Sequence, residues 1–144
     1  MSEWGPASFE NDAASDWFLL VEEAPDPGGV IAAALDSAVG ESEYLGFDDS
    51  CVALAAAELS ASCAGQTSAR LPDNVRYWAE THPHQPHDSE VNQAVHAVQR
   101  IREESELRDY WERTVDREKW LREVDDLISR LEQSGAGEPA TLSP

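Results

Sequence analysis

The chain has 144 residues and a formal net charge of −19, from 29 acidic and 10 basic residues. This length suits one domain with a single core, and a hydrophobic share of 41% is too high for an intrinsically disordered chain. The negative charge argues against nucleic acid and anionic lipid as partners, since both bind positive surfaces. With no apolar stretch long enough to span a bilayer and no signal-peptide pattern at the start, we expect a soluble cytoplasmic protein without a membrane partner.

The charge is distributed unequally along the chain. Residues 1–69 contain 13 acids and no Lys or Arg, whereas residues 70–144 contain 16 acids and all 10 basic residues. The first part therefore carries a formal charge of −13 and the second a charge of −6. Such a field favours a basic protein partner, or it serves solubility alone.

Two helices are predicted at the start of the chain, where apolar residues recur with helical spacing. The first begins at Asn11 or Asp12 and stops at Pro25. The second follows an Asp26 cap and has Pro27 at its first position, where its missing N–H costs nothing.

A third helix is predicted over the alanine-rich stretch "SCVALAAAELSASCA", and its composition indicates a closely packed, largely buried helix. Asp48 or Asp49 is the expected N-cap, and Gly65 ends the helix. Cys51 and Cys63 are 12 residues apart, about 18 Å along a helix, which is too far for a disulfide. We therefore expect two buried, reduced thiols.

Four further helices are predicted in the second half of the chain. They cover residues 71–80, 88–101, 105–115 and 116–133, with Val75, Trp78, Val91, Ala94, Val95, Val98, Ile101, Leu107, Trp111, Trp120, Val124, Leu127 and Leu131 among the residues facing inward. Residues 81–88 cannot continue a helix, because two prolines remove backbone donors. The last helix has the strongest amphipathic pattern.

Together these elements predict one all-α domain over residues 1–133. Six to seven short helices with tight polar connections are typical of a compact, irregular bundle. No internal repeat is present, and residues 134–144 are expected to form a disordered tail.

Short motifs along nearly the whole chain resemble one family. They are Trp4-Gly5, Phe9, Asn11-Asp12, Ala13 and Asp16-Trp17 near the start, Tyr44-Leu45 before the alanine-rich helix, and Ser105-Glu106-Leu107, Trp111 and Trp120 in the last helices. On these residues the chain resembles a bacterial family of uncharacterised proteins, the domain of unknown function DUF4259. The resemblance implies an all-α fold and supplies no activity. Residues 6–8 depart from the usual Gly or Thr-Gly before the Phe, which predicts a stiffer loop.

Asn11, Asp12 and Asp16 form the first candidate site. On a helix, Asp12 and Asp16 share one face, where like charges repel unless a positive group lies between them. We interpret the set as a helix start, in which a cap and first-turn acids satisfy backbone donors and complement the dipole. Arg108 or Arg113 from the second half of the chain is a candidate partner for Asp16.

The five tryptophans are expected mainly in the core. Trp4 and Phe9 precede the first helix and are predicted to pack onto Trp17 as a hydrophobic staple. Trp4 or Trp78, which lie beside loops, is the expected partner anchor if one tryptophan is exposed.

The histidines His82, His84 and His87 lie within six residues, and His96 follows in the next helix. Zinc or nickel accepts imidazoles at such spacing, but a proline-broken loop does not preset a tetrahedral site, so we favour a solvated loop. No motif for nucleophilic catalysis or phosphate binding is present, so no catalytic residue and no cofactor is expected.

The leading hypothesis is a non-enzymatic interaction module, in the manner of a small immunity protein or antitoxin, that binds a basic partner surface. Its expected contacts are Trp4, Asp12, Asp16, Asp48 and Asp49. One alternative is a metal-binding protein or metal-dependent hydrolase that uses Asp12, Asp16 and the His82–His87 loop, with a further acid such as Asp48 or Asp49. Another is a nucleic-acid mimic whose carboxylates are spaced like phosphates.

Overall fold

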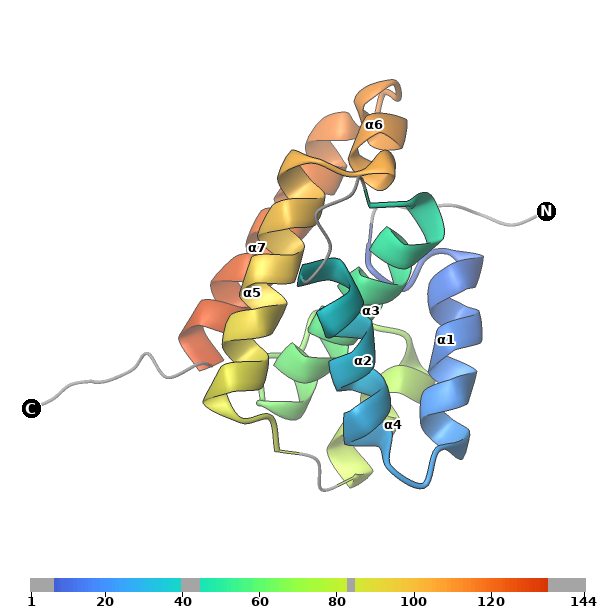
Figure 1. Ribbon diagram of the computed structural model, residues 1–144, viewed down its shortest axis with the longest axis vertical. Helices are drawn as coiled ribbons and strands as arrows, with labels where there is room; N and C mark the ends of the chain where they lie inside the picture. Colours follow the sequence, from blue (N-terminus) through green and yellow to red (C-terminus); the bar gives the residue numbers. More distant parts are fainter. Residues whose placement is uncertain (1–6, 40–44, 83–84, 135–144) are drawn as a thin grey trace, which may run out of the picture.

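The computed structural model describes residues 7–39, 45–82 and 85–134, and the regular structure in these ranges is helical (Figure 1). The helices are α1 (Asp12–Glu23), α2 (Pro27–Val39), α3 (Phe47–Cys63), α4 (Asp73–Thr81), α5 (Asp88–Glu103), α6 (Glu106–Glu112) and α7 (Arg117–Ser134). Extended pairing in the described ranges amounts to one isolated parallel bridge between Leu45 and Ser105. The predicted all-α bundle is therefore confirmed. Trp4, Gly5, Tyr44 and the predicted tail after Ser134 lie outside the described residues.

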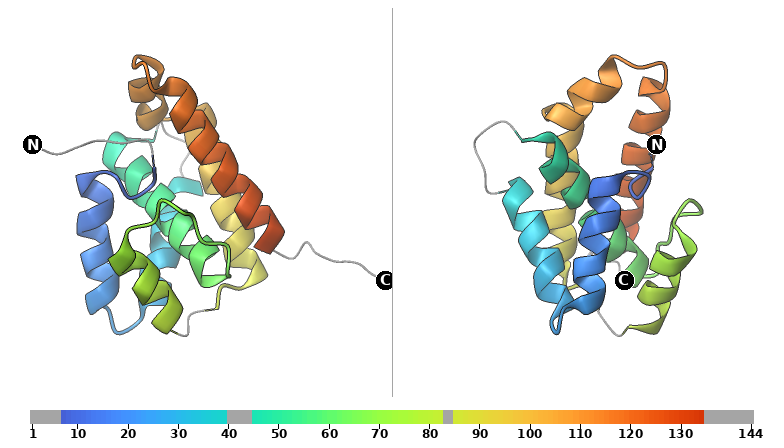
Figure 2. Two further views of the ribbon diagram at one scale, coloured as in Figure 1. Left: turned by 180° about the vertical axis from the view of Figure 1, so that it is seen from behind. Right: turned by 90° about the vertical axis from the view of Figure 1, so that its right-hand side faces the viewer.

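The centre of the bundle is α3, which contacts each of the other six helices (Figures 1 and 2). From Ser50 to Cys63, every residue except Val52 is buried. A helix that is apolar on all sides has no face to offer to water and must be surrounded. The prediction of a closely packed, buried helix is confirmed, as is that of two buried free thiols, Cys51 and Cys63.

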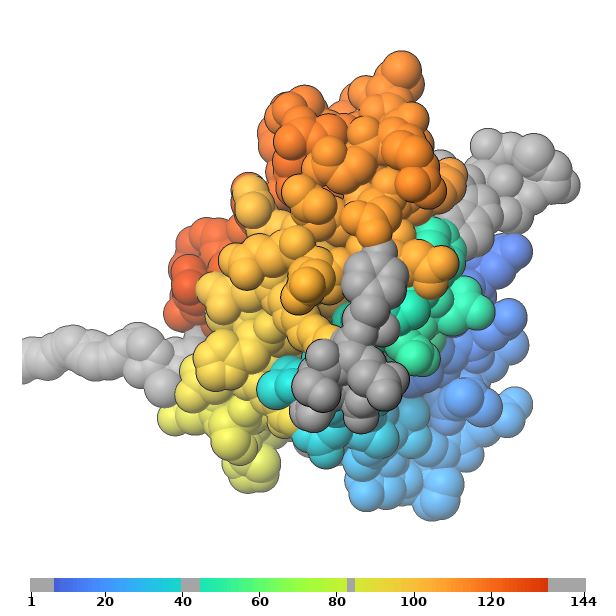
Figure 3. All heavy atoms as spheres, turned by 45° about the horizontal axis from the view of Figure 1, so that its top comes forward, coloured from blue at the N-terminus to red at the C-terminus, as the bar shows by residue number. Residues whose placement is uncertain are grey.

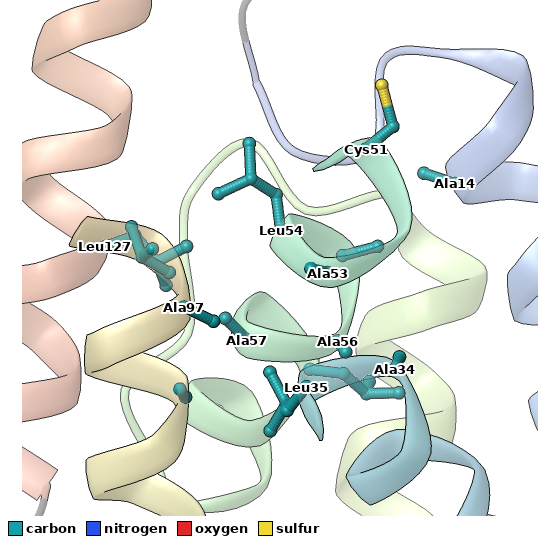
Figure 4. Packing of buried hydrophobic residues seen from close by; sticks show 14 of the residues in the cluster. Ala14, Ala34, Leu35, Cys51, Ala53, Leu54, Ala56, Ala57, Ala97 and Leu127 are labelled. Atoms are coloured by element: carbon teal, nitrogen blue, oxygen red, sulfur yellow. The ribbon is translucent and has the colours of Figure 1, made fainter. Parts of the chain in front are cut away.

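Alanine side chains allow the neighbouring helices to approach α3 closely. In Figure 4, Ala57 of α3 points towards Ala97 of α5, and Ala56 lies beside Ala34 of α2. All four side chains are more than nine-tenths buried. Because protein interiors are packed at crystal density, these short side chains determine how near the helix axes can come.

The start of α1 follows the sequence prediction. Asn11 is the N-cap, and its Oδ1 accepts a hydrogen bond from the Ala14 amide at 2.8 Å. Phe9, which we expected to pack on Trp17, makes an edge-to-face ring contact with Phe18, with centroids 6.0 Å apart. Trp17 itself is buried.

The start of α3 differs from the prediction, because neither Asp48 nor Asp49 is its N-cap. The helix begins earlier, at Phe47, with Gly46 in the cap position. Glu106 of α6 accepts a hydrogen bond from the Phe47 amide at 2.9 Å, so a side chain distant in sequence satisfies this free donor. The two aspartates instead occupy the first turn, where they complement the helix dipole.

The end of α3 requires a glycine. Gly65 has a φ of +92°, in the left-handed region that side chains disfavour. Its amide donates to the Ser62 carbonyl at 3.0 Å, and the Gln66 amide donates to the Ala61 carbonyl at 2.8 Å. These two bonds form a Schellman motif, so the predicted stop at Gly65 is confirmed.

The long helices α5 and α7 pack against each other and against α3. Their buried residues follow the predicted apolar stripes and are Val91, Ala94, Ala97, Val98 and Ile101 in α5 and Trp120, Val124, Leu127 and Leu131 in α7. Among the described ranges, none of the helices has the length and apolar character needed to cross a membrane.

Candidate functional site

An open apolar groove separates α1 from α2, and α3 contributes to its floor. Its volume is about 640 Å³, and its lining consists of Trp17, residues 24–26, Gly29, Val30, Ala33, Ala34 and Val52. Figure 3 shows α1 and α2, in blue and cyan, adjacent on one side of the surface. The short side chains of Gly29, Ala33 and Ala34 on α2 do not fill the groove, so it has room for side chains from another molecule.

The apolar surface continues from the groove onto α1. Trp17, Leu20 and Ala24 are spaced three and four residues apart and so share one helix face. Leu20 is 60% exposed, and the adjacent Leu19 is 55% exposed. A leucine so exposed beside an apolar groove is available to be covered by a partner.

The rim of the groove is acidic. Asp16 lies one turn before Leu20, Asp12 lies one turn before Asp16, and Glu23 follows Leu20 by three residues, all of them exposed. Asp26 belongs to the lining itself. Residues 12–39 contain six acids and no Lys or Arg, so the chain that forms most of the groove is acidic, while Arg100 of α5 reaches the far end of α2 and donates to the Ala38 carbonyl at 2.6 Å.

The other predicted partner contacts are distributed around this region. Asp48 and Asp49 are exposed in the first turn of α3, one turn before the groove residue Val52. Within the described residues Asp16 has no ion pair, and Arg108 instead contacts Glu112 at 3.3 Å. The Asp16 carboxylate is therefore exposed to solvent.

The predicted histidine set is only partly described, because His84 falls outside the described residues. The ring of His82 stacks on Trp78 with centroids 4.5 Å apart, and its Nδ1 lies 2.9 Å from the Trp78 carbonyl oxygen. His87 is exposed at the N-cap position of α5. Within the described ranges, no group of three or more His, Cys, Asp or Glu residues is placed to hold a metal ion.

A buried ion pair between Glu58 and Arg130 was missed by the sequence analysis. Nη1 and Nη2 of the Arg130 guanidinium lie 2.6 and 3.0 Å from the two Glu58 carboxylate oxygens, and the side chains of Glu58 and Arg130 are only 5% and 11% exposed. Arg130 also binds the Gln66 carbonyl at 3.0 Å and Asp126 at 2.7 Å. Burial lowers the pKa of Arg130. The hydrogen bonds and charges of Glu58 and Asp126 raise the pKa by more than burial lowers it, so the net shift is upward.

One signal for this pair was present in the sequence. Glu58 interrupts the apolar run "VALAAAEL", and a charge on a helix that is otherwise apolar all round requires a buried partner. The sequence does not reveal that the partner is Arg130, 72 residues later. We interpret the pair as structural, since the hollow beside Glu58 has room for about one water molecule only, at about 10 Å³.

The two thiols are unsuited to nucleophilic chemistry. Burial, with a smaller contribution from the charge of Asp48, raises the pKa of Cys51 to about 12. Burial and Glu90 raise the pKa of Cys63 to about 11. Since the thiolate is the reactive form, both cysteines are inert near neutral pH.

The raised thiol pKa values predict a loss of stability in base. In the unfolded chain the thiols ionise near pH 9.0, their ordinary pKa, whereas in the native protein they remain protonated to higher pH. Ionisation in the unfolded state alone stabilises that state relative to the native one. Between pH about 9 and about 11, the free energy of unfolding of the wild type should therefore fall more steeply than that of a Cys51→Ala/Cys63→Ala variant. Urea unfolding followed by circular dichroism measures both slopes, and parallel slopes would contradict the prediction.

One known protein family matches most of the chain. The family described as "Domain of unknown function (DUF4259)" matches residues 2–123. The chain belongs to the DUF4259 family. The DUF4259 match includes the α1–α2 groove and Glu58, and it ends at residue 123, before Arg130. Neither a curated protein nor a solved structure matches the chain.

Proposed function

We propose that this protein is a non-enzymatic interaction module that binds a basic amphipathic segment of a partner protein in the α1–α2 groove. The observation that carries the proposal is an apolar groove set within a stretch of the chain, residues 12–39, that has acidic charges and no basic ones. Apolar side chains of the partner would fill the groove and cover Leu20, while its Lys and Arg side chains would meet the rim.

In this binding mode, apolar contacts supply most of the affinity, and charges set the association rate and the specificity. Burying an exposed leucine such as Leu20 contributes about 1.5–3 kcal/mol at most, and the groove adds further apolar contact. The acidic rim accelerates encounter with a positive segment and disfavours acidic ones, and salt weakens this effect. This proposed role is that of a small regulatory protein of the immunity-protein or antitoxin kind, and two reduced thiols fit a cytoplasmic location.

A model peptide tests the proposal without knowledge of the natural partner. A short amphipathic helix of Leu and Lys is titrated into ¹⁵N-labelled protein, with a Leu and Glu peptide of equal length as control. For the basic peptide only, we expect saturable changes in the amide chemical shifts of α1, of α2 and of residues around Val52. Binding should be weaker at higher salt. Shifts centred on other helices, or equal binding of both peptides, would refute the proposed groove.

A substitution that blocks the groove should weaken binding of the basic peptide. Ala33 is exposed within the groove lining, so Ala33→Arg should fold normally while filling the groove and repelling a basic segment. We expect the basic peptide to bind at least about tenfold more weakly, about 1.4 kcal/mol. Asn92→Arg, which adds the same charge at an exposed position of α5, is the control and should change binding far less.

The same pair of variants identifies a natural partner. A protein that the wild type and Asn92→Arg capture from host lysate at low salt, and that Ala33→Arg does not capture, is the candidate. Its sequence must contain a basic amphipathic segment, and that segment as a peptide must reproduce the shifts in α1 and α2. A partner bound equally by all three proteins would place the interface elsewhere.

A further inference from the structure

Among the residues that line the α1–α2 groove, Asp26 is the one with a charged side chain. It belongs to the turn between α1 and α2, directly before the first residue of α2 (Figure 1). Ala34, the last groove residue on α2, comes eight residues later, which is about 12 Å along a helix axis. Asp26 therefore lies at one end of the groove.

The missing side chain of Gly29 leaves space for the Asp26 carboxylate. A Cβ built on Gly29 would lie 2.7 Å from Oδ2 of Asp26, which is closer than two such atoms can approach. Asp26 is exposed, and within the described ranges no Lys, Arg or His forms an ion pair with it. The carboxylate oxygens are therefore within reach of a side chain on a molecule that occupies the groove.

The two ends of α2 differ in charge. At the α1–α2 turn, Glu23 is exposed close to the groove. At the far end of α2, Arg100 donates to the Ala38 carbonyl at 2.6 Å, and Asp36 accepts a hydrogen bond from Gln93. Among the lining residues, a positive side chain in the groove therefore finds its carboxylate at the α1–α2 turn.

We propose that Asp26 determines the specificity of the groove, and that the partner segment is a helix with one Lys or Arg at an end of its apolar stripe. The assignment rests on the proposed function. Val30 and Ala33 lie four and seven residues after Asp26, so a helix along α2 with its basic side chain at Asp26 places its own residues four and seven positions away opposite them. Those residues must be apolar, and the groove then recognises a sequence pattern in a helix.

Three peptides of identical composition test this pattern with the full-length protein. Each is an amphipathic helix of Leu and Lys in which one Lys and one Ala exchange places. This Lys lies at the N-terminal end of the apolar stripe, at its C-terminal end, or on the polar face. We expect one end position to bind about fivefold more tightly than the polar-face position, near the upper limit for an exposed ion pair. The preferred end gives the direction of the bound helix, and amide-shift titrations measure all three affinities.

Three variants test whether Asp26 causes the preference. Asp26→Asn should abolish it. Gly29→Ala keeps every charge but displaces the carboxylate, so it should reduce the preference while urea stability stays equal or rises, because alanine favours helix. Glu22→Gln removes a charge from an exposed position of α1 outside the lining and should leave the preference unchanged. Because the readout is a ratio between peptides, an effect common to all of them cancels.

The outcomes distinguish the role of Asp26 from the proposed function. If none of the three peptides shifts the amides of α1 and α2, both proposals fail. If all three bind there equally well, or if Asp26→Asn keeps the preference of the wild type, the groove is still the interface but the role given to Asp26 is wrong. Loss of the preference in Glu22→Gln would also contradict that role, since the effect would then come from overall charge.

Discussion

Replacing Arg130 by alanine is expected to destabilise the protein by about 3–5 kcal/mol, because Glu58 would remain buried without its positive partner. The two side chains form a bidentate pair at 2.6 and 3.0 Å, almost fully removed from water. Removing one partner leaves a buried charge uncompensated, which costs more than the net contribution of the intact pair. Urea unfolding followed by circular dichroism measures the loss.

Two further variants separate the buried pair from ordinary surface charges. Arg102 pairs with Asp125 at 2.6 Å, but the side chains are 37% and 54% exposed, so Arg102→Ala should cost less than about 1 kcal/mol. Replacing both Glu58 and Arg130 by methionine should recover most of the loss, since neither charge then remains buried. An Arg130→Ala variant as stable as Arg102→Ala would show that Glu58 finds another partner or water.

Trp120→Ala is the second variant expected to have a large effect, with a loss of about 3–5 kcal/mol. Trp120 is 2% exposed and is among the largest fully buried side chains of the described residues. It lies in the first turn of α7, so its removal leaves a cavity where α7 begins. The surrounding helices can fill this cavity only in part.

Two comparisons test whether the loss arises from the cavity. Trp120→Phe removes fewer atoms and should cost clearly less than Trp120→Ala, as measured by urea unfolding. Leu20→Ala removes an apolar side chain that is 60% exposed and should change stability by less than about 0.5 kcal/mol, while weakening the basic peptide in the groove. A Trp120→Ala variant of wild-type stability would contradict the packing described here.

The local parts of the fold were predictable because their signals are local. Asn11 caps α1 by accepting a hydrogen bond from the amide of Ala14, three residues later in the chain, and the glycine at position 65 permits the turn that ends α3. The apolar stripes of α5 and α7 depend only on the helical period. The predicted start of α3 was wrong because the residue that satisfies its first amide is far away in the sequence. Glu106 accepts the hydrogen bond of the Phe47 amide from 59 residues away.

The candidate sites were predictable only in part. The excess of acids in residues 1–69 indicated a negative surface, and the structure adds that Asp16 borders an exposed leucine beside an apolar groove. No feature of the sequence indicated that α1 and α2 leave such a groove between them.

Local signals in the sequence were sufficient to predict that this chain forms helices, where most of them begin and end, which faces are buried, and that it resembles DUF4259. These properties follow from period, caps and breakers within a few residues of one another. Tertiary packing was needed to show that Glu58 pairs with Arg130, that α3 contacts each of the other six helices, and that α1 and α2 border an apolar groove. Each of these brings together residues far apart in the chain, and their proximity is determined by how the helices pack rather than by any local pattern.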